Sequence, residues 1–111
     1  MAYDLPRTLL GRTGLSITRF GIGGAYCESV AGYQAALDSG VNYVDTARAY
    51  RNGADEEVIG QAIRGRRHEL VLATKTSARD AERARNDLQS SLRLLGTDHL
   101  DIIQLLSLIH I

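Results

Sequence analysis

The chain has 111 residues, of which 44% are hydrophobic and 23% charged, and this composition is ordinary for one soluble globular domain. Its formal net charge is zero and its pI is about 6.8, so we expect no nucleic-acid or membrane partner. A single cysteine, Cys27, excludes an internal disulfide and suits a reducing compartment such as the cytoplasm. The amino-terminal residues lack the basic start and apolar stretch of a signal peptide.

Short apolar runs recur along the chain. A glycine-containing turn between two β-prone segments predicts a hairpin over 8–18. Runs at 41–45, 70–75 and 100–105 are rich in Val, Ile, Leu or Tyr, as buried parallel strands are, and 19–24 is a fourth candidate strand. The first three begin about thirty residues apart, which is the size of one βα unit.

Helical patterns separate these runs. The first, over 30–39, is short and ends at Gly40. The second, over 55–64, opens with three acidic residues that suit the positive end of a helix. The third and clearest, over 80–95, has apolar residues at helical spacing and ends at Gly96, with Ser77 or Asp80 able to cap its start.

Strands and helices that alternate in this way predict an α/β fold with a parallel sheet. Two closed architectures fit the pattern, namely a doubly wound sheet and a (β/α)8 barrel. A complete barrel takes about 250 residues, so a hairpin followed by about four βα strands is the first half of one. In either architecture, functional side chains gather at the carboxyl ends of the strands.

Three polar residues are expected at that edge. Asp45 and Lys75 each close an apolar run, and Tyr50 follows Asp45 by five residues. Lys75 is also the only lysine beside twelve arginines. A tyrosine, with an ordinary pKa of about 10, is a poor acid near neutral pH, but a neighbouring ammonium favours the phenolate. Such a group can protonate a carbonyl oxygen; the alternative is a buried Asp–Lys pair with Tyr50 packed in a loop.

The other residue types with reactive side chains have structural interpretations. Cys27 has no adjacent histidine, so we expect a structural thiol. His68 and His99 precede strands and are expected in solvated turns, and no spacing suits a metal site. The stretch GIGGA, at 21–25, begins like a dinucleotide fingerprint but lacks its third glycine, so we interpret it as small residues that let something flat approach closely.

Four stretches, in this order, resemble landmarks of the aldo-keto reductases: LGRTGLSITRFGIGG, GVNYVDTARAYRNGADEEVIGQAI, LVLATKT and SLRLLGTDHLDIIQL. The resemblance runs from about Leu9 to Leu105. It implies a (β/α)8 barrel that transfers hydride between NADP(H) or NAD(H) and a small carbonyl or sugar substrate. The sequences of residues 73–80 and 97–105 are similar to those of a bacterial subgroup, some members of which have an iron-sulfur segment after the barrel.

The resemblance also assigns roles to residues. Tyr50 matches the family's proton donor, Lys75 the lysine that activates it, and Asp45 the partner of that lysine. Gly24 and Ala25 match a segment whose backbone lies beside the nicotinamide, and Asp45 also approaches the nicotinamide ribose.

The family's fourth catalytic residue is a histidine five positions after the aspartate of the fourth strand. From Asp101 this is position 106, which is a leucine, and His110 lies nine positions along. The last six residues, LSLIHI, are what the mosaic-end adapter of transposase-made sequencing libraries encodes. We therefore predict that 1–105 is the first half of the barrel and that 106–111 is a non-native tail.

A half-barrel lacks most of the family's contacts to the cofactor, so we expect this chain alone to be inactive, to bind no cofactor with useful affinity and to expose apolar surface. Two alternatives stay open. One is a nucleotide-sensing barrel that resembles a channel subunit and turns over little. The other is a half-barrel that self-associates into a complete one.

Overall fold

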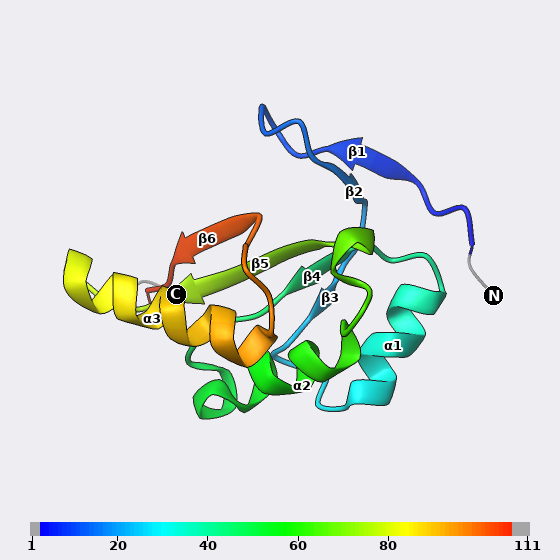
Figure 1. Cartoon of the computed structure of the whole chain (residues 1–111). Coiled ribbons are helices and arrows are strands. Elements are labelled where there is room, and N and C mark those ends of the chain that lie inside the picture. The colour runs from blue at the N-terminus through cyan, green and yellow to red at the C-terminus, as the bar shows by residue number, and fades with distance from the viewer. Residues whose placement is uncertain (1–2, 108–111) are drawn as a thin grey trace.

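The computed structural model describes residues 3–107 of the chain. Over these residues an antiparallel hairpin precedes a parallel sheet whose strands alternate with helices (Figure 1). The strands are β1 (Arg7–Leu9), β2 (Ser16–Thr18), β3 (Ile22–Gly23), β4 (Tyr43–Asp45), β5 (Val71–Thr76) and β6 (Ile102–Leu105). The helices are α1 (Val30–Asp38), α2 (Ala54–Ala62) and α3 (Ala81–Leu95), with 3₁₀ turns η1 (Tyr50–Gly53) and η2 (Arg67–Glu69).

The order of the parallel strands decides between the two architectures. The sheet runs β3-β4-β5-β6, so each strand pairs with the next one in the chain and the order never reverses. The helices cover one side of the sheet, and the hairpin lies at the amino-terminal ends of its strands (Figure 1). A doubly wound sheet reverses its strand order and has helices on both faces. The fold is therefore an incomplete (β/α)8 barrel, as the resemblance implied.

Local sequence sets the ends of two helices. The Ser29 side chain accepts a hydrogen bond from the Gly32 N–H and caps α1. Of the two caps proposed for α3, it is Asp80 that accepts from the Arg83 N–H, and α3 ends at Gly96 with a φ of 67°. The helix α2 ends at Ala62, two residues before the expected end at residue 64.

The core lies between the sheet and the helices. Val44 and Leu72, from the two central strands, are fully buried there, and burying each such side chain stabilises the fold by roughly 1.5–3 kcal/mol. Tyr33, Ile59 and Leu95 contribute one large buried side chain from each helix. On α2 and its C-cap the predicted apolar residues Ile59, Ala62 and Ile63 are buried, whereas on α3 only Leu95 of the predicted apolar residues is buried.

The side chain of Asn42 attaches the hairpin to the sheet. Asn42 is buried just before β4, where its Oδ1 accepts from the Thr18 N–H at 2.7 Å. Its Nδ2 donates to the Ser16 carbonyl at 3.0 Å, and its own N–H donates to the Thr18 hydroxyl at 3.2 Å. The hairpin is therefore held at the amino-terminal end of the sheet, away from the ends where the candidate site lies.

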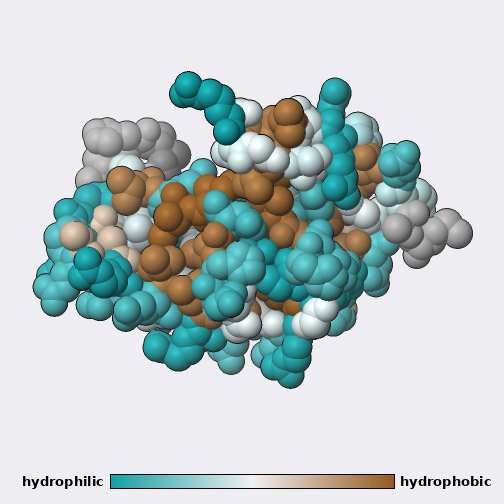
Figure 2. Space-filling model, turned by 45° about the horizontal axis from the view of Figure 1, so that its top comes forward, coloured by the Kyte–Doolittle hydropathy of each residue, from teal (hydrophilic) through white to brown (hydrophobic). Residues whose placement is uncertain are grey.

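The sheet has an open edge at β6 in the described part of the chain. The strand β6 pairs only with β5 among the described residues, and its Ile103 and Leu105 are 47% and 76% exposed. Figure 2, turned toward the side of the sheet away from the helices, shows hydrophobic residues gathered across the middle of that face. An unpaired edge beside exposed apolar side chains is an aggregation hazard.

Gly60 allows α2 and α3 to pack closely. A methyl group on Gly60 would lie 2.4 Å from the Leu94 carbonyl oxygen, so Gly60→Ala must push the two helices apart. We expect a net loss of about 1–2 kcal/mol of stability, because overpacking outweighs alanine's helix preference. Thermal unfolding followed by circular dichroism measures it. Gly23→Ala is the control, since its methyl group meets no atom within 4 Å; equal melting temperatures for both variants would contradict the close packing.

Candidate active site

Asp45, Tyr50 and Lys75 meet at the carboxyl end of the sheet, as predicted. The Lys75 ammonium donates to the Asp45 carboxylate at 2.6 Å, to the Thr46 carbonyl at 2.9 Å and to the Tyr50 hydroxyl at 3.3 Å. Strand periodicity explains why Lys75 faces this way. Side chains alternate along β5, so that Thr74 points toward α2 and Lys75 toward the opposite face.

The lysine is held in its charged form. Burial by itself disfavours the ammonium, but the hydrogen bond and the negative charge of Asp45, with a further contribution from Tyr50, outweigh it and raise the pKa of Lys75. The side chains of Lys75 and Asp45 are only 13% and 30% exposed, so solvent screens the pair weakly. The ammonium also lies 5.0 Å from the centre of the Tyr50 ring.

The predicted cofactor-facing segment lies beside Asp45. The Gly24 N–H donates to the Asp45 carbonyl at 2.8 Å, which continues the pairing of β3 with β4. Gly24 is buried and Ala25 is exposed. A side chain added to Gly23 would meet nothing within 4 Å. Small residues therefore leave open space next to the Asp45 side chain.

Two carboxylates in the first turn of α2 are buried behind this site, and their burial was not predicted. Asp55 is fully buried and accepts from the Tyr33 hydroxyl at 2.7 Å, from the Thr46 hydroxyl and from the Arg51 guanidinium at 2.8 Å. Glu56 is equally buried and has different partners. Its carboxylate contacts Arg48 at 3.1 Å and the Thr74 hydroxyl at 2.8 Å.

A signal for this burial was present in the sequence. Asp55 and Glu56 lie four and three positions before Ile59, so helical spacing places them on the apolar face of α2. Because acidic residues also suit a helix N-terminus, their position on the apolar face was overlooked. Both are indeed in the first turn of α2, but their partners come from η1, the strand ends and α1.

The remaining sequence expectations have mixed outcomes. His68 and His99 lie in exposed turns before β5 and β6, as predicted. Cys27 is half-buried, with its thiol 3.8 Å from the Ser29 carbonyl, and its structural role stays a prediction. At position 106 the leucine N–H pairs with Thr76 at 2.8 Å, and His110 is outside the described residues.

The tyrosine behind the site gives a pH-dependent prediction. Burial and the hydrogen bond to Asp55 raise the pKa of Tyr33 above its ordinary value of 10.0. The unfolded chain loses this proton at a lower pH than the folded one, so the contribution to stability is present below pH 10.0 and lost as pH rises above it. Tyr33→Phe is expected to cost about 1–3 kcal/mol at pH 7, because Asp55 loses a donor.

Urea unfolding at pH values from neutral to strongly alkaline tests this prediction. We expect the free energy of unfolding to fall less steeply above pH 10.0 in Tyr33→Phe than in the unchanged chain. Lys75 and Tyr43, whose pKa values are also raised, are present in both proteins, so their contributions cancel. Parallel curves in the alkaline range would contradict the assignment.

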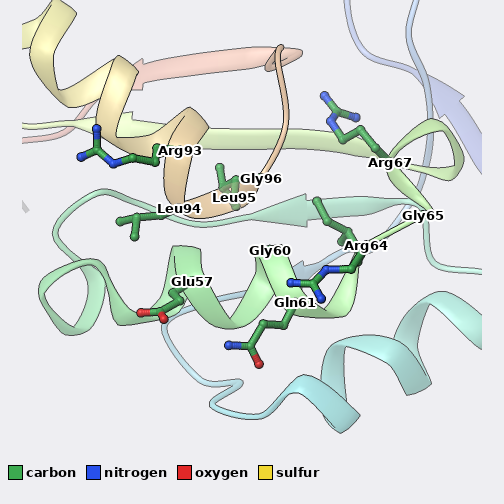
Figure 3. A pocket seen from close by; sticks show the side chains of 11 residues that line it. Glu57, Gly60, Gln61, Arg64, Gly65, Arg67, Arg93, Leu94, Leu95 and Gly96 are labelled. Atoms are coloured by element: carbon green, nitrogen blue, oxygen red, sulfur yellow. The ribbon is translucent and has the colours of Figure 1, made fainter.

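The outer hollow between α2 and α3 does not compete with this site. Figure 3 shows the guanidinium groups of its three arginines, Arg64, Arg67 and Arg93, lying apart from one another, so they do not converge on one ligand. Within residues 3–107, no group of His, Cys, Asp and Glu side chains is placed to hold a metal ion. None of the helices in the same range is long and apolar enough to cross a membrane.

Comparison with known proteins identifies the family. The model of the aldo/keto reductase family matches residues 23–108, which include every residue of the candidate site. The chain belongs to the aldo/keto reductase family. Among curated relatives of this family, aldo-keto reductase YhdN of Bacillus subtilis is 37% identical over 87% of this chain.

Solved aldo-keto reductases share the fold. The holo form of AKR11C1 from Bacillus halodurans superposes with a TM-score of 0.80 and 29% identity over 91% of this chain. An aldo/keto reductase from Klebsiella pneumoniae in complex with NADP and acetate gives a TM-score of 0.75 and 37% identity over 83%. The chain spans only 36% of the length of the B. subtilis relative and 40% and 36% of these two structures.

Proposed function

We propose that the protein to which this chain belongs is an NADP(H)- or NAD(H)-dependent oxidoreductase of aldehydes and ketones, or of the corresponding alcohols and sugars. One observation supports this proposal above the others: the Lys75 ammonium contacts both the Asp45 carboxylate and the Tyr50 hydroxyl. The distance of 3.3 Å between the phenol oxygen and the ammonium favours this proposal over an Asp–Lys pair with Tyr50 only packed in a loop.

Each of the three side chains has a separate task in this proposal. Tyr50 delivers a proton to the substrate's carbonyl oxygen. Lys75 stabilises the negative charge that the phenol oxygen then carries. Asp45 keeps the lysine charged and directs its ammonium toward Tyr50. In the oxidative direction the same groups take the proton from an alcohol.

The residues around Asp45 fit a nicotinamide cofactor. Gly23 and Ala25 leave a flat, open approach beside Asp45, and one carboxylate oxygen of Asp45 stays free of the lysine. When bound, the cofactor supplies the hydride. Two solved aldo-keto reductase structures from Klebsiella pneumoniae, one with NADP and one with NADPH, support NADP(H). We therefore propose Gly24, Ala25 and Asp45 as its contacts in this half of the barrel.

The chain by itself is proposed to be the first half of the barrel, at 1–105, with a non-native tail at 106–111. The short span relative to the relatives and the open edge at β6 support the half-barrel, whereas the proposed tail rests on the sequence LSLIHI alone. We expect the chain alone to be inactive. Sequencing the locus from genomic DNA tests the tail, since an intact gene with LSLIHI in place would contradict it.

The full-length product of that gene tests the function. Methylglyoxal is a suitable first substrate, because a relative from Escherichia coli is named a methylglyoxal reductase, and small aldehydes and sugars complete the panel. We expect carbonyl-dependent loss of NADPH or NADH absorbance. Absence of turnover with every carbonyl and alcohol, by a protein that is folded, would refute the proposal.

A second candidate is a nucleotide-sensing subunit. A relative from Schizosaccharomyces pombe, 32% identical over 90% of this chain, carries the name of a voltage-gated potassium channel β-subunit. Tight NADPH binding with at most a slow single turnover would favour this role over a free enzyme. Size-exclusion chromatography of the chain separates both from a self-associating half-barrel, which would elute as a dimer.

A further inference from the structure

The backbone after Tyr50 adopts a costly conformation. Arg51 and Asn52 have φ values of 48° and 54°, and Gly53 follows at 89°. A non-glycine residue in the left-handed region is disfavoured, and two in succession persist only where the surroundings hold them. The segment that carries the proposed proton donor is therefore fixed by contacts elsewhere.

The Arg51 side chain makes those contacts. Its Nη2 lies 2.7 Å from the Gly24 carbonyl, 2.6 Å from the Cys27 carbonyl and 2.8 Å from the Asp55 carboxylate. One guanidinium thus joins the loop after Tyr50 to the loop after β3. The second of these loops contains Gly24 and Ala25, the proposed contacts of the nicotinamide.

Asp55 extends the connection to the lysine. It is fully buried, and its carboxylate also accepts from the hydroxyl of Thr46, whose carbonyl in turn accepts from the Lys75 ammonium at 2.9 Å. Gly24 lies against the same carboxylate so closely that a Cβ there would come within 1.8 Å of it. The buried Asp55 carboxylate therefore contacts both Thr46, which binds the lysine, and Gly24.

We propose that Arg51 and Asp55 are a positioning pair, which holds the Gly24–Cys27 loop in register with Tyr50 and Lys75. The proposal rests on the proposed function, and it adds residues that touch neither substrate nor cofactor. Arg48 and Glu56 form the neighbouring buried pair, but their contacts reach Thr74 on the helix side of β5 and no part of the Gly24–Cys27 loop.

Variants of Arg51 in the full-length protein test the pair. Arg51→Met removes the donors and keeps an unbranched chain, whereas Arg51→Lys keeps a charge with three donors on a slightly shorter side chain. Arg66→Met is the matched control. Arg51 pairs with two carboxylates, those of Asp55 and of Glu28 at 3.8 Å. Arg66 likewise pairs with Asp38 and Glu69, but at the opposite end of the helices.

A displaced loop changes both chemistry and cofactor affinity. We expect Arg51→Met to lower kcat by about tenfold to a hundredfold and to raise the Kd of NADPH by about tenfold, since ångström-scale misplacement costs this much. Arg51→Lys is expected to recover part of both losses, and Arg66→Met to leave kcat and Kd unchanged. Equal losses of melting temperature in Arg51→Met and Arg66→Met, with kcat and Kd unchanged in both, would overturn the proposal.

Amide hydrogen exchange separates this proposal from the proposed function, because it needs no turnover. The Gly24 N–H donates to the Asp45 carbonyl at 2.8 Å, and the Cys27 N–H donates to the Gly23 carbonyl at 3.3 Å. We expect Arg51→Met to accelerate exchange at both amides, and Arg66→Met to leave them unchanged. Faster exchange in a protein without carbonyl reductase activity would refute the function alone, whereas unchanged exchange would refute the positioning role.

Discussion

Tyr50→Phe in the full-length protein is expected to lower kcat for carbonyl reduction by about 10²–10⁴-fold, the usual contribution of a positioned acid. The change removes only the hydroxyl that lies 3.3 Å from the Lys75 ammonium and keeps the ring that packs beside it. The Kd of NADPH should change little, because Tyr50 is not among the proposed cofactor contacts. Steady-state kinetics and a fluorescence titration of NADPH measure the two effects.

Tyr3→Phe is the matched control for this variant. Tyr3 is 65% exposed and precedes the hairpin, and its N–H donates to the carbonyl of Ser39, which lies between α1 and the start of β4. The same loss of a hydroxyl there should leave kcat unchanged. If Tyr50→Phe behaved like Tyr3→Phe, another group would deliver the proton and the proposed mechanism would be wrong.

Arg48→Met is expected to produce the largest loss of stability among these variants. Glu56 is fully buried, and without Arg48 its carboxylate keeps, among the described residues, only the Thr74 hydroxyl as a donor. Removing one partner of a buried ion pair costs about 3–5 kcal/mol, which is a large share of the 5–15 kcal/mol that typically holds a domain together. Urea unfolding of the full-length protein measures the loss.

The double variant Arg48→Met/Glu56→Leu distinguishes an unpaired charge from lost packing. Apolar residues in place of both partners remove the buried charge, so the double variant should be more stable than Arg48→Met alone by about 1–3 kcal/mol. Glu56→Leu alone should cost less than Arg48→Met, since Arg48 is 27% exposed and can turn toward solvent. A double variant less stable than both single ones would show that packing dominates.

Much of the fold could be predicted because its signals are local. Apolar runs placed the four parallel strands, and helical spacing with caps placed α1, α2 and α3 to within two residues at each end. The order of the strands could not be predicted from these patterns, since a doubly wound sheet and a barrel use the same alternation. Resemblance to a family pointed to the barrel, and the pairing of β3 to β6 confirmed it.

Only part of the candidate site could be predicted from the sequence. Asp45 and Lys75 could be predicted to meet because they lie near the carboxyl ends of adjacent parallel strands, and Tyr50 because a short loop returns it to the same edge. Arg51 and Asp55 could not, because their contacts with Gly24, Cys27 and Tyr33 join segments more than twenty residues apart. No local pattern encodes such pairings, although helical spacing alone would have shown Asp55 on the buried face of α2.

The Lys75 ammonium is the centre of this account, and its removal and replacement by an added amine test it most directly. In the full-length protein, Lys75→Ala should lower kcat by about 10²-fold or more, and propylammonium in the buffer should restore part of that loss by occupying the space beside Tyr50 and Asp45. The same amine should not restore Tyr50→Phe. A Lys75→Ala protein that keeps the kcat of the unchanged enzyme would contradict the role assigned to the lysine.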